Sequence, residues 1–181
     1  MTDYSIILAG FGGQGILSSG RIVATAALLE GREVSWFPSY GPEMRGGTAN
    51  CSVVISDEAI GSPVVNEPDV LIALNGPSLE KFAGQVRPGG LVIVDRSLVH
   101  QQPQRDDLRF FAIPASEMAS NLGNMAFATV ILLGCLSRNS DCMGREAFEK
   151  ALYEVLPERH HHLIPAEMSA FDQGVAFQAA T

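Results

Sequence analysis

The sequence has few of the features that mark metal-binding, secreted or membrane-spanning chains. Its three cysteines, Cys51, Cys135 and Cys142, form no C-x-x-C pair, so no zinc or iron–sulfur site is expected on this chain. Their odd number, and the apolar runs around two of them, favour buried reduced thiols in a reducing compartment over disulfides. The longest apolar stretch, residues 125–136, is too short to span a bilayer, and residues 1–5 lack the cationic flank of a signal peptide. We therefore expect a cytoplasmic protein without membrane contact.

Positive charge is also scarce. Twelve basic residues stand against twenty acidic ones, giving a formal net charge of −8, and only Lys81 and Lys150 are lysines. A negative long-range field repels phosphate backbones, so no nucleic-acid partner is expected. The length of 181 residues and the hydrophobic content of 46% suit one compact domain covering residues 1–181.

Apolar runs of strand length alternate with segments of helical periodicity along most of the chain. The first strand, helix and second strand are predicted to form a right-handed β-α-β unit of a parallel sheet. Residues 48–55, a β-branched run, are followed by a turn and by residues 60–65, and these two runs are expected to pair as a small β-hairpin insertion. Strands are expected at residues 4–9, 33–37, 70–74, 91–94 and 109–113, and helices at residues 16–29, 125–137, 145–156 and 166–177, with Gly31 ending the first helix and Ser116 capping a helix after Pro114.

A glycine-rich loop of the form G-x-G-x-x-G lies between the first strand and the first helix, the context in which such loops bind anions. Nicotinamide dinucleotides also need a carboxylate at the end of the second strand, where this chain has Trp36, Phe37 and Pro38. Three interpretations stay open: dinucleotide binding, a tight turn with no ligand, and binding of another anionic group, which is favoured. The residues expected to bind a cofactor are Gly10, Gly12, Gly13, Gln14, Gly15 and Asn75. The fold class predicted is a single α/β domain with a mostly parallel, Rossmann-like sheet and helices on both faces.

A second unusual loop follows the second strand, so it is expected at the same edge of the sheet. Arg45 between flexible residues can present its guanidinium to a phosphate or carboxylate, and Glu43 can orient it. The alternative is an ion pair on the surface. The residues expected to contact a substrate or a partner are Tyr40, Glu43, Met44, Arg45, Gly46 and Gly47.

Other polar groups are less specific. Asn75 follows the third strand and Asp95 ends the fourth, where each can bind a ligand or cap a local turn. The run from His160 to His162 fits a solvated connector better than a metal site, because consecutive side chains point in different directions. No catalytic acid–base pair and no metal ligand is assigned to this chain.

The two loops carry a resemblance to a known family. Gly10-Phe11-Gly12-Gly13-Gln14-Gly15-Ile16 and Tyr40-Gly41-Pro42-Glu43-Met44-Arg45-Gly46-Gly47-Thr48-Ala49 resemble the gamma domain of 2-oxoacid:ferredoxin oxidoreductases. The likeness continues through Leu74-Asn75, residues 89–95 and Asn124-Met125. Met44 and Gly47 are more similar to the 2-oxoglutarate or branched-chain type than to the pyruvate type, and indolepyruvate oxidoreductases share a similar first loop.

The resemblance implies an assembly in which thiamine diphosphate lies between alpha and beta subunits, and iron–sulfur clusters lie on beta and delta chains. The reaction it implies is coenzyme A-dependent oxidative decarboxylation of a 2-oxoacid, with electrons passing to ferredoxin. This chain would be inactive alone and would bind no cofactor alone. Its acidity argues that ferredoxin, itself usually acidic, docks on another subunit. The alternatives are a freestanding dinucleotide-binding oxidoreductase domain and a non-catalytic scaffold.

Overall fold

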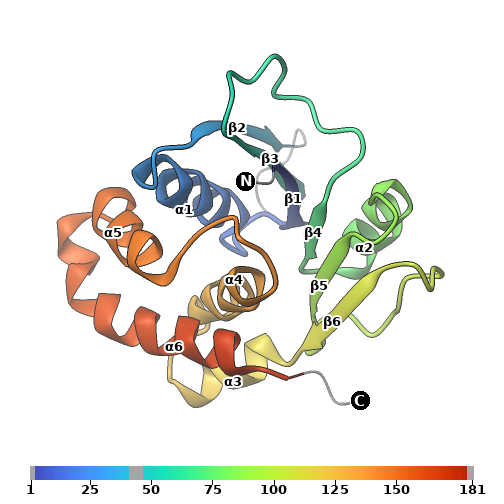
Figure 1. The fold of residues 1–181 in the computed structure, drawn as a ribbon. Coiled ribbons are helices and arrows are strands. Elements are labelled where there is room, and N and C mark those ends of the chain that lie inside the picture. The colour runs from blue at the N-terminus through green and yellow to red at the C-terminus, as the bar shows by residue number, and fades with distance from the viewer. Residues whose placement is uncertain (1–2, 41–46, 179–181) are drawn as a thin grey trace.

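The computed structural model describes residues 3–40 and 47–178, which form one α/β domain around a six-stranded sheet in the order β2-β3-β1-β4-β5-β6 (Figure 1). β1, β4, β5 and β6 are parallel, and β3 runs antiparallel to both of its neighbours. The predicted single, mostly parallel sheet is therefore confirmed. The strands are β1 (Tyr4–Phe11), β2 (Glu33–Tyr40), β3 (Thr48–Ser56), β4 (Val70–Ala73), β5 (Leu91–Asp95) and β6 (Arg109–Ile113).

Helices cover both faces of this sheet, as the sequence predicts. α1, α3, α4, α5 and α6 pack on one face, while α2 and the short 3-10 helix η1 pack on the other. No helix within residues 3–40 and 47–178 is both long and apolar enough to cross a membrane. The helices are α1 (Ile16–Leu29), α2 (Gly76–Phe82), η1 (Ala83–Gln85), α3 (Ala115–Asn121), α4 (Phe127–Asn139), α5 (Arg145–Val155), η2 (Glu158–Leu163) and α6 (Ile164–Ala176).

The predicted β-α-β unit is present, because β1 and β2 both run antiparallel to β3 and hence parallel to each other, but the two strands are not neighbours. β3 is inserted between them and pairs along its length with both strands. The expected hairpin between residues 48–55 and 60–65 is wrong, since residues 60–65 form no strand and β2 is the hairpin partner of β3. Gly61 and Pro63 interrupt the shorter run, and proline cannot donate to a ladder, so it competes poorly with two full-length strands.

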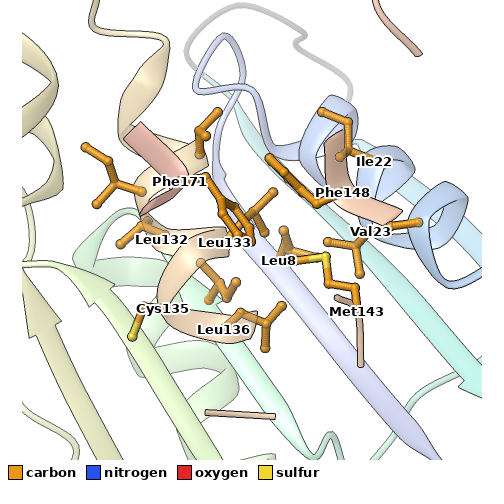
Figure 2. Close-up of a cluster of buried hydrophobic side chains, with 14 of the residues drawn as sticks. Leu8, Ile22, Val23, Leu132, Leu133, Cys135, Leu136, Met143, Phe148 and Phe171 are labelled. Carbon is orange, nitrogen blue, oxygen red and sulfur yellow. The ribbon is translucent and has the colours of Figure 1, made fainter. Parts of the chain in front are cut away.

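The main hydrophobic core lies between the sheet and the larger helical layer. Figure 2 shows Leu8 of β1 beside Phe148 of α5 and Phe171 of α6, whose rings stack with centroids 4.2 Å apart. α4 contributes Leu132, Leu133 and Leu136 to this cluster and is buried on nearly all sides, as its uniformly apolar sequence predicts. Side chains alternate along β1, so Ile7 and Ala9 face a smaller core under α2.

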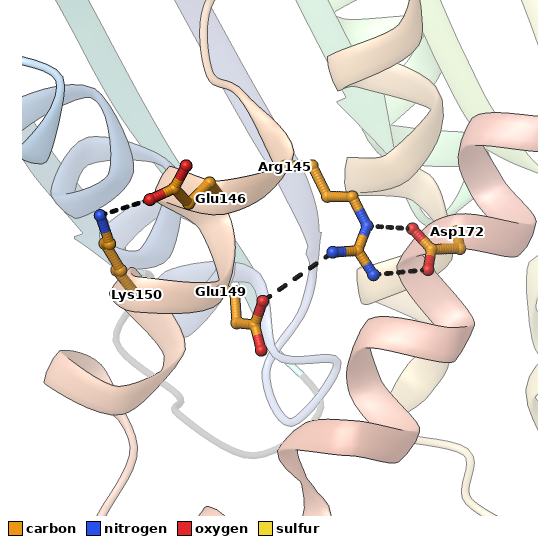
Figure 3. Close-up of polar contacts among 5 residues, drawn as sticks. All are labelled: Arg145, Glu146, Glu149, Lys150 and Asp172. Carbon is orange, nitrogen blue, oxygen red and sulfur yellow. Dashed lines mark hydrogen bonds and ion pairs between the residues drawn. The ribbon is translucent and has the colours of Figure 1, made fainter.

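The outer surface of the larger layer carries exposed ion pairs between helices (Figure 3). Arg145 of α5 donates two hydrogen bonds to the Asp172 carboxylate of α6, at 2.7 and 2.8 Å. These bonds hold the pKa of Asp172 below its ordinary value. Lys150 pairs with Glu146 one turn away at 2.7 Å. Because solvent screens all of these groups, the core rather than this network holds α5 against α6.

All three cysteines are free and fully buried, so the predicted burial is confirmed. Burial raises the pKa of Cys51 to about 12 and the pKa values of Cys135 and Cys142 to about 11. Each thiol therefore stays neutral in the folded chain at pH values where an unfolded chain ionises.

This difference predicts a loss of stability at alkaline pH. A thiol ionises near pH 8.5 in an unfolded chain, so each contributes fully to folding below that pH and loses about 1.4 kcal/mol for each pH unit above it, until its folded-state pKa is reached. Guanidinium unfolding at pH 7.5 and 9.5 measures the loss. The Cys142→Ala variant should lose about 1.4 kcal/mol less than the native chain over this interval. Equal losses in the two chains would contradict the assignment.

Candidate functional site at the carboxyl edge of the sheet

The sheet has a topological switch point between β1 and β4. β1 leads into α1 on one face, whereas β4 leads into α2 on the opposite face. In open α/β sheets, the crevice outside the carboxyl ends of two such strands is the usual ligand site. The glycine loop follows β1 directly and therefore lies at this crevice.

The conformation of the loop requires glycine at two positions. Gly13 and Gly15 have φ angles of 92° and 77°, in the left-handed region that disfavours residues with a Cβ. Gly15 is also the residue before α1, and no side chain in the described part of the chain caps that helix end. Among the described residues, the first amides of α1 thus face the edge of the sheet without a capping side chain, and such an end attracts anions.

Gln14 uses both polar groups of its side chain inside the protein. Its Oε1 accepts a hydrogen bond from the Phe11 N–H at 2.6 Å, and its Nε2 donates to the Leu74 carbonyl at 3.3 Å. Gly10 leaves the space for this arrangement, because a Cβ there would lie 2.5 Å from Gln14 Oε1. This use of Gln14 differs from the ligand contact that the sequence predicts.

The second loop begins and ends at the same edge as the first. Phe11 pairs with Thr48, Tyr40 pairs with Ala49, and the Gly12 N–H donates to the Gly47 carbonyl at 2.9 Å. The two loops are therefore joined where they leave the sheet. The contacts predicted for Glu43, Met44, Arg45 and Gly46, and for the Tyr40 side chain, lie outside the described residues and stay predictions.

Two cavities flank the glycine loop. One, of about 310 Å³, lies between the loop, the start of α1 and the start of β3. The other, of about 350 Å³, lies between the loop, the end of β4 and the start of α4. Gly13 and Gly15 line both, so the loop is the wall between them. In the described part of the chain, no charged side chain lines either cavity, and the exposed side chains of Phe11, Leu98 and Met125 give them apolar rims.

Asn75 and Asp95 have local bonding partners. Asn75 Oδ1 caps α2 by accepting from the Ser78 N–H at 2.8 Å, while its buried Nδ2 has no partner within residues 3–40 and 47–178. Asp95 accepts the Ser97 N–H at 3.0 Å and both the N–H and the hydroxyl of Ser116, at 3.1 and 2.5 Å. The predicted cap at Ser116 is therefore wrong, because the stronger acceptor, a buried carboxylate, takes that role.

The run from His160 to His162 lies far along the chain from the loops, in η2. His161 Nε2 is 2.9 Å from the Leu156 carbonyl, and its ring meets that of Tyr153 edge to face. Among the described residues, no three His, Cys, Asp or Glu side chains are grouped to hold a metal ion.

The geometry also argues against a nicotinamide site. Such sites place a carboxylate at the end of a strand adjacent to β1, where it can reach the ribose. Here β3 separates β2 from β1, and β2 ends in Phe37, Pro38, Ser39 and Tyr40. The ribose-binding carboxylate therefore has no counterpart in β2.

Comparison with known proteins identifies the family. Residues 5–177 match the family model described as pyruvate ferredoxin/flavodoxin oxidoreductase. The chain belongs to this family. Similar family members include ketoisovalerate oxidoreductase subunit VorA of Methanothermobacter marburgensis, 50% identical over 134 residues, which cover 74% of this chain. They also include 2-oxoglutarate synthase subunit KorC of Methanocaldococcus jannaschii, 38% identical over 156 residues, which cover 84% of this chain and 83% of KorC.

Identity is lower to a subunit that pyruvate and ketoisovalerate enzymes share. The common gamma subunit of the pyruvate and ketoisovalerate oxidoreductases of Thermococcus litoralis is 28% identical over 179 residues, covering 93% of this chain and 96% of its own. The matches to VorA and KorC confirm the predicted likeness to the 2-oxoglutarate and branched-chain types. The chain spans only 28% and 31% of the lengths of two VorA relatives.

Solved structures of family members share the fold. The gamma subunit of a keto/oxoacid ferredoxin oxidoreductase from Geobacter sulfurreducens superposes with a TM-score of 0.84 at 28% identity, covering 97% of this chain and 98% of its own. The 2-oxoglutarate:ferredoxin oxidoreductase of Magnetococcus marinus, with 2-oxoglutarate, coenzyme A and succinyl-CoA bound, superposes with a TM-score of 0.86 at 27% identity. That match covers 97% of this chain and 31% of the other.

Proposed function

We propose that this chain is the gamma subunit of a multi-subunit 2-oxoacid:ferredoxin oxidoreductase acting on 2-oxoglutarate or 2-oxoisovalerate. The assembled enzyme would oxidatively decarboxylate the 2-oxoacid with coenzyme A, giving acyl-CoA and carbon dioxide and passing two electrons to ferredoxin. The likeness to VorA, KorC and a gamma-subunit structure over most of the chain carries this proposal.

The chain would complete a site whose reactive groups belong to alpha, beta and delta subunits. Thiamine diphosphate would supply the carbanion chemistry and iron–sulfur clusters would carry the electrons, both held by those partners. Two observations support this division. All three thiols are fully buried, so they are poorly placed to ligate a cluster at an interface. The described cavity linings also offer no general acid or base. Ferredoxin would dock on another subunit, and the whole assembly would be cytoplasmic.

The glycine loop would bind an anionic group of the substrate or of coenzyme A. The amides of Gly13 and Gly15 and the uncapped start of α1 are suited to this role. Gly12 and Gln14 would act indirectly, because their N–H groups already donate to Gly47 and Phe11. The buried Asn75 Nδ2 is a further donor near this edge.

The second loop would supply the positive charge that the described linings lack. Arg45 would bind the anion, oriented by Glu43, while the rest of the loop contacts the partner. Those partner contacts are assigned to Tyr40, Met44, Gly46 and Gly47.

In the assembled enzyme, Arg45→Ala is expected to raise KM for coenzyme A or the 2-oxoacid about tenfold, the worth of one charge-assisted hydrogen bond. Arg138→Ala is the matched control, because Arg138 is an exposed arginine in the last turn of α4, at the end opposite the cavity. Steady-state kinetics with each substrate varied measures both. Unchanged constants for both substrates would remove Arg45 from the site, whereas poorer recovery of the complex on size exclusion would assign it to the interface.

The subunit role is tested by purification from the native cells. The chain should co-purify with alpha and beta partners in brown material that contains thiamine diphosphate. Reconstitution without the chain should abolish 2-oxoacid-dependent ferredoxin reduction. Full activity without it would reduce the chain to a dispensable scaffold.

A further inference from the structure

The hydrogen-bond ladder between β1 and β4 ends in an unusual way. The Leu74 N–H donates to the Ala9 carbonyl at 2.9 Å, as a regular parallel ladder requires. The next bond of such a ladder would join the Phe11 N–H to the Leu74 carbonyl. Instead, the Gln14 carboxamide stands between these two groups, accepting from Phe11 at 2.6 Å and donating to Leu74 at 3.3 Å.

A carboxamide suits this place because it carries the same donor and acceptor as a peptide group. When β1 turns away from β4, the exposed Phe11 N–H and the partly buried Leu74 carbonyl would otherwise lose their partners in the ladder. The Gln14 amide satisfies both across the wider gap. The Gln14 N–H also donates to the Phe11 carbonyl at 3.2 Å, so residues 11 and 14 are joined twice.

We propose that Gln14 is a positioning residue whose carboxamide replaces the last rung of the β1–β4 ladder and so fixes the glycine loop at the switch point. The effect that this inference predicts on KM rests on the proposed function. The role of Gln14 in the ladder does not. Gln14 lines the cavity of about 350 Å³, and its bond to Leu74 sets how far the loop wall stands from β4. The bonds of Gln14 to Phe11 and Leu74 thereby also fix the orientation of the Gly13 and Gly15 amides.

The first test uses amide hydrogen exchange of the chain alone. In Gln14→Met, which keeps the length of the side chain but removes both polar atoms, the Phe11 amide should lose about tenfold in protection. The Leu74 amide is the internal reference, because its bond to Ala9 does not involve Gln14. Equal loss of protection at both amides would show general destabilisation and would overturn the positioning role.

The second test uses the titration of a near-isosteric variant. In Gln14→Glu, the Leu74 carbonyl repels a carboxylate and moves it away from both groups, so its bond to the Phe11 N–H is weakened, whereas a protonated carboxyl can accept from Phe11 and donate to Leu74. Protection of the Phe11 amide, corrected for intrinsic exchange, should therefore recover as pH falls through a carboxyl pKa raised above about 4.3. No ionisable side chain lines this cavity in the described residues, and the Asp95 carboxylate bonds to Ser116, which does line it. If protection of the Phe11 amide in this variant does not change with pH, the proposal that the side chain at position 14 replaces a ladder bond is refuted.

The third test uses the assembled enzyme. Gln14→Met should raise KM about tenfold for the anionic ligand held by the loop and leave kcat within about twofold. Gln14→Glu should recover towards the native KM at the lower end of the working pH range. A fall in kcat with unchanged KM would contradict positioning of a binding loop. If hydrogen exchange behaves as expected but no KM changes, the role of Gln14 in the ladder is supported and the ligand site proposed at the glycine loop is refuted.

Discussion

Replacing Gly174 by alanine is expected to destabilise the domain by about 3 kcal/mol, although alanine normally favours a helix over glycine by about 1 kcal/mol. The sign reverses because α4 and α6 touch through their backbones. A Cβ at Gly174 would overlap the Ile131 carbonyl oxygen, and a Cβ at Gly134 would overlap that of Phe171. Backbone atoms cannot rotate aside as a side chain can, so the helices must separate and loosen the core around Phe171.

Thermal and guanidinium unfolding of the chain measure this effect, with an expected fall in Tm of about 10 °C. Gly84→Ala is the matched control, because a Cβ at Gly84 meets no atom within 4 Å and its φ is not positive. That substitution should change stability by less than about 0.5 kcal/mol. If Gly174→Ala behaved like the control, α4 and α6 would not be in backbone contact.

The parts of the fold that could be predicted are those specified by local patterns. The fully apolar runs at β4 and β5 are buried on both faces, and Gly31, with a φ of 83°, ends α1 as expected. The position of β3 could not be predicted in this way, because strand order depends on pairing between distant residues. One local signal was available in the sequence of β3: apolar residues recur at every second position from Ala49 to Ile55, with mostly polar residues between them, as in an antiparallel strand with one solvated face.

The candidate site could likewise be predicted only in part. The glycines with positive φ and the uncapped start of α1 follow from the G-x-G-x-x-G spacing and its context. The use of Gln14 does not follow, because its partner Leu74 is sixty residues away and its space depends on Gly10. From sequence alone, a polar residue in a binding loop is predicted to contact a ligand. Only the arrangement of β1 beside β4 reveals that its amide completes the sheet.

The largest effect on activity is expected from a negative charge at Gly13. Gly13→Asp would place a carboxylate on the wall shared by both cavities, where an anionic ligand is proposed to bind. Two like charges about 4 Å apart near a protein surface repel by about 4 kcal/mol, so kcat/KM of the assembled enzyme should fall at least about 100-fold. A Cβ at this position meets no atom of the described residues within 4 Å, so steric overlap with them does not explain such a loss.

Gly13→Asn is the control that isolates charge from shape. Asparagine and aspartate have nearly the same size, and both tolerate the left-handed backbone better than other residues with a Cβ. The asparagine variant therefore bears the same backbone strain, about 1 kcal/mol, without the repulsion. Raising the salt concentration should narrow the gap between the two variants, because screening weakens the repulsion but not the strain. Equal losses in both variants at low salt would mean that the loop needs glycine for its geometry alone, and the anion site proposed at Gly13 and Gly15 would be refuted.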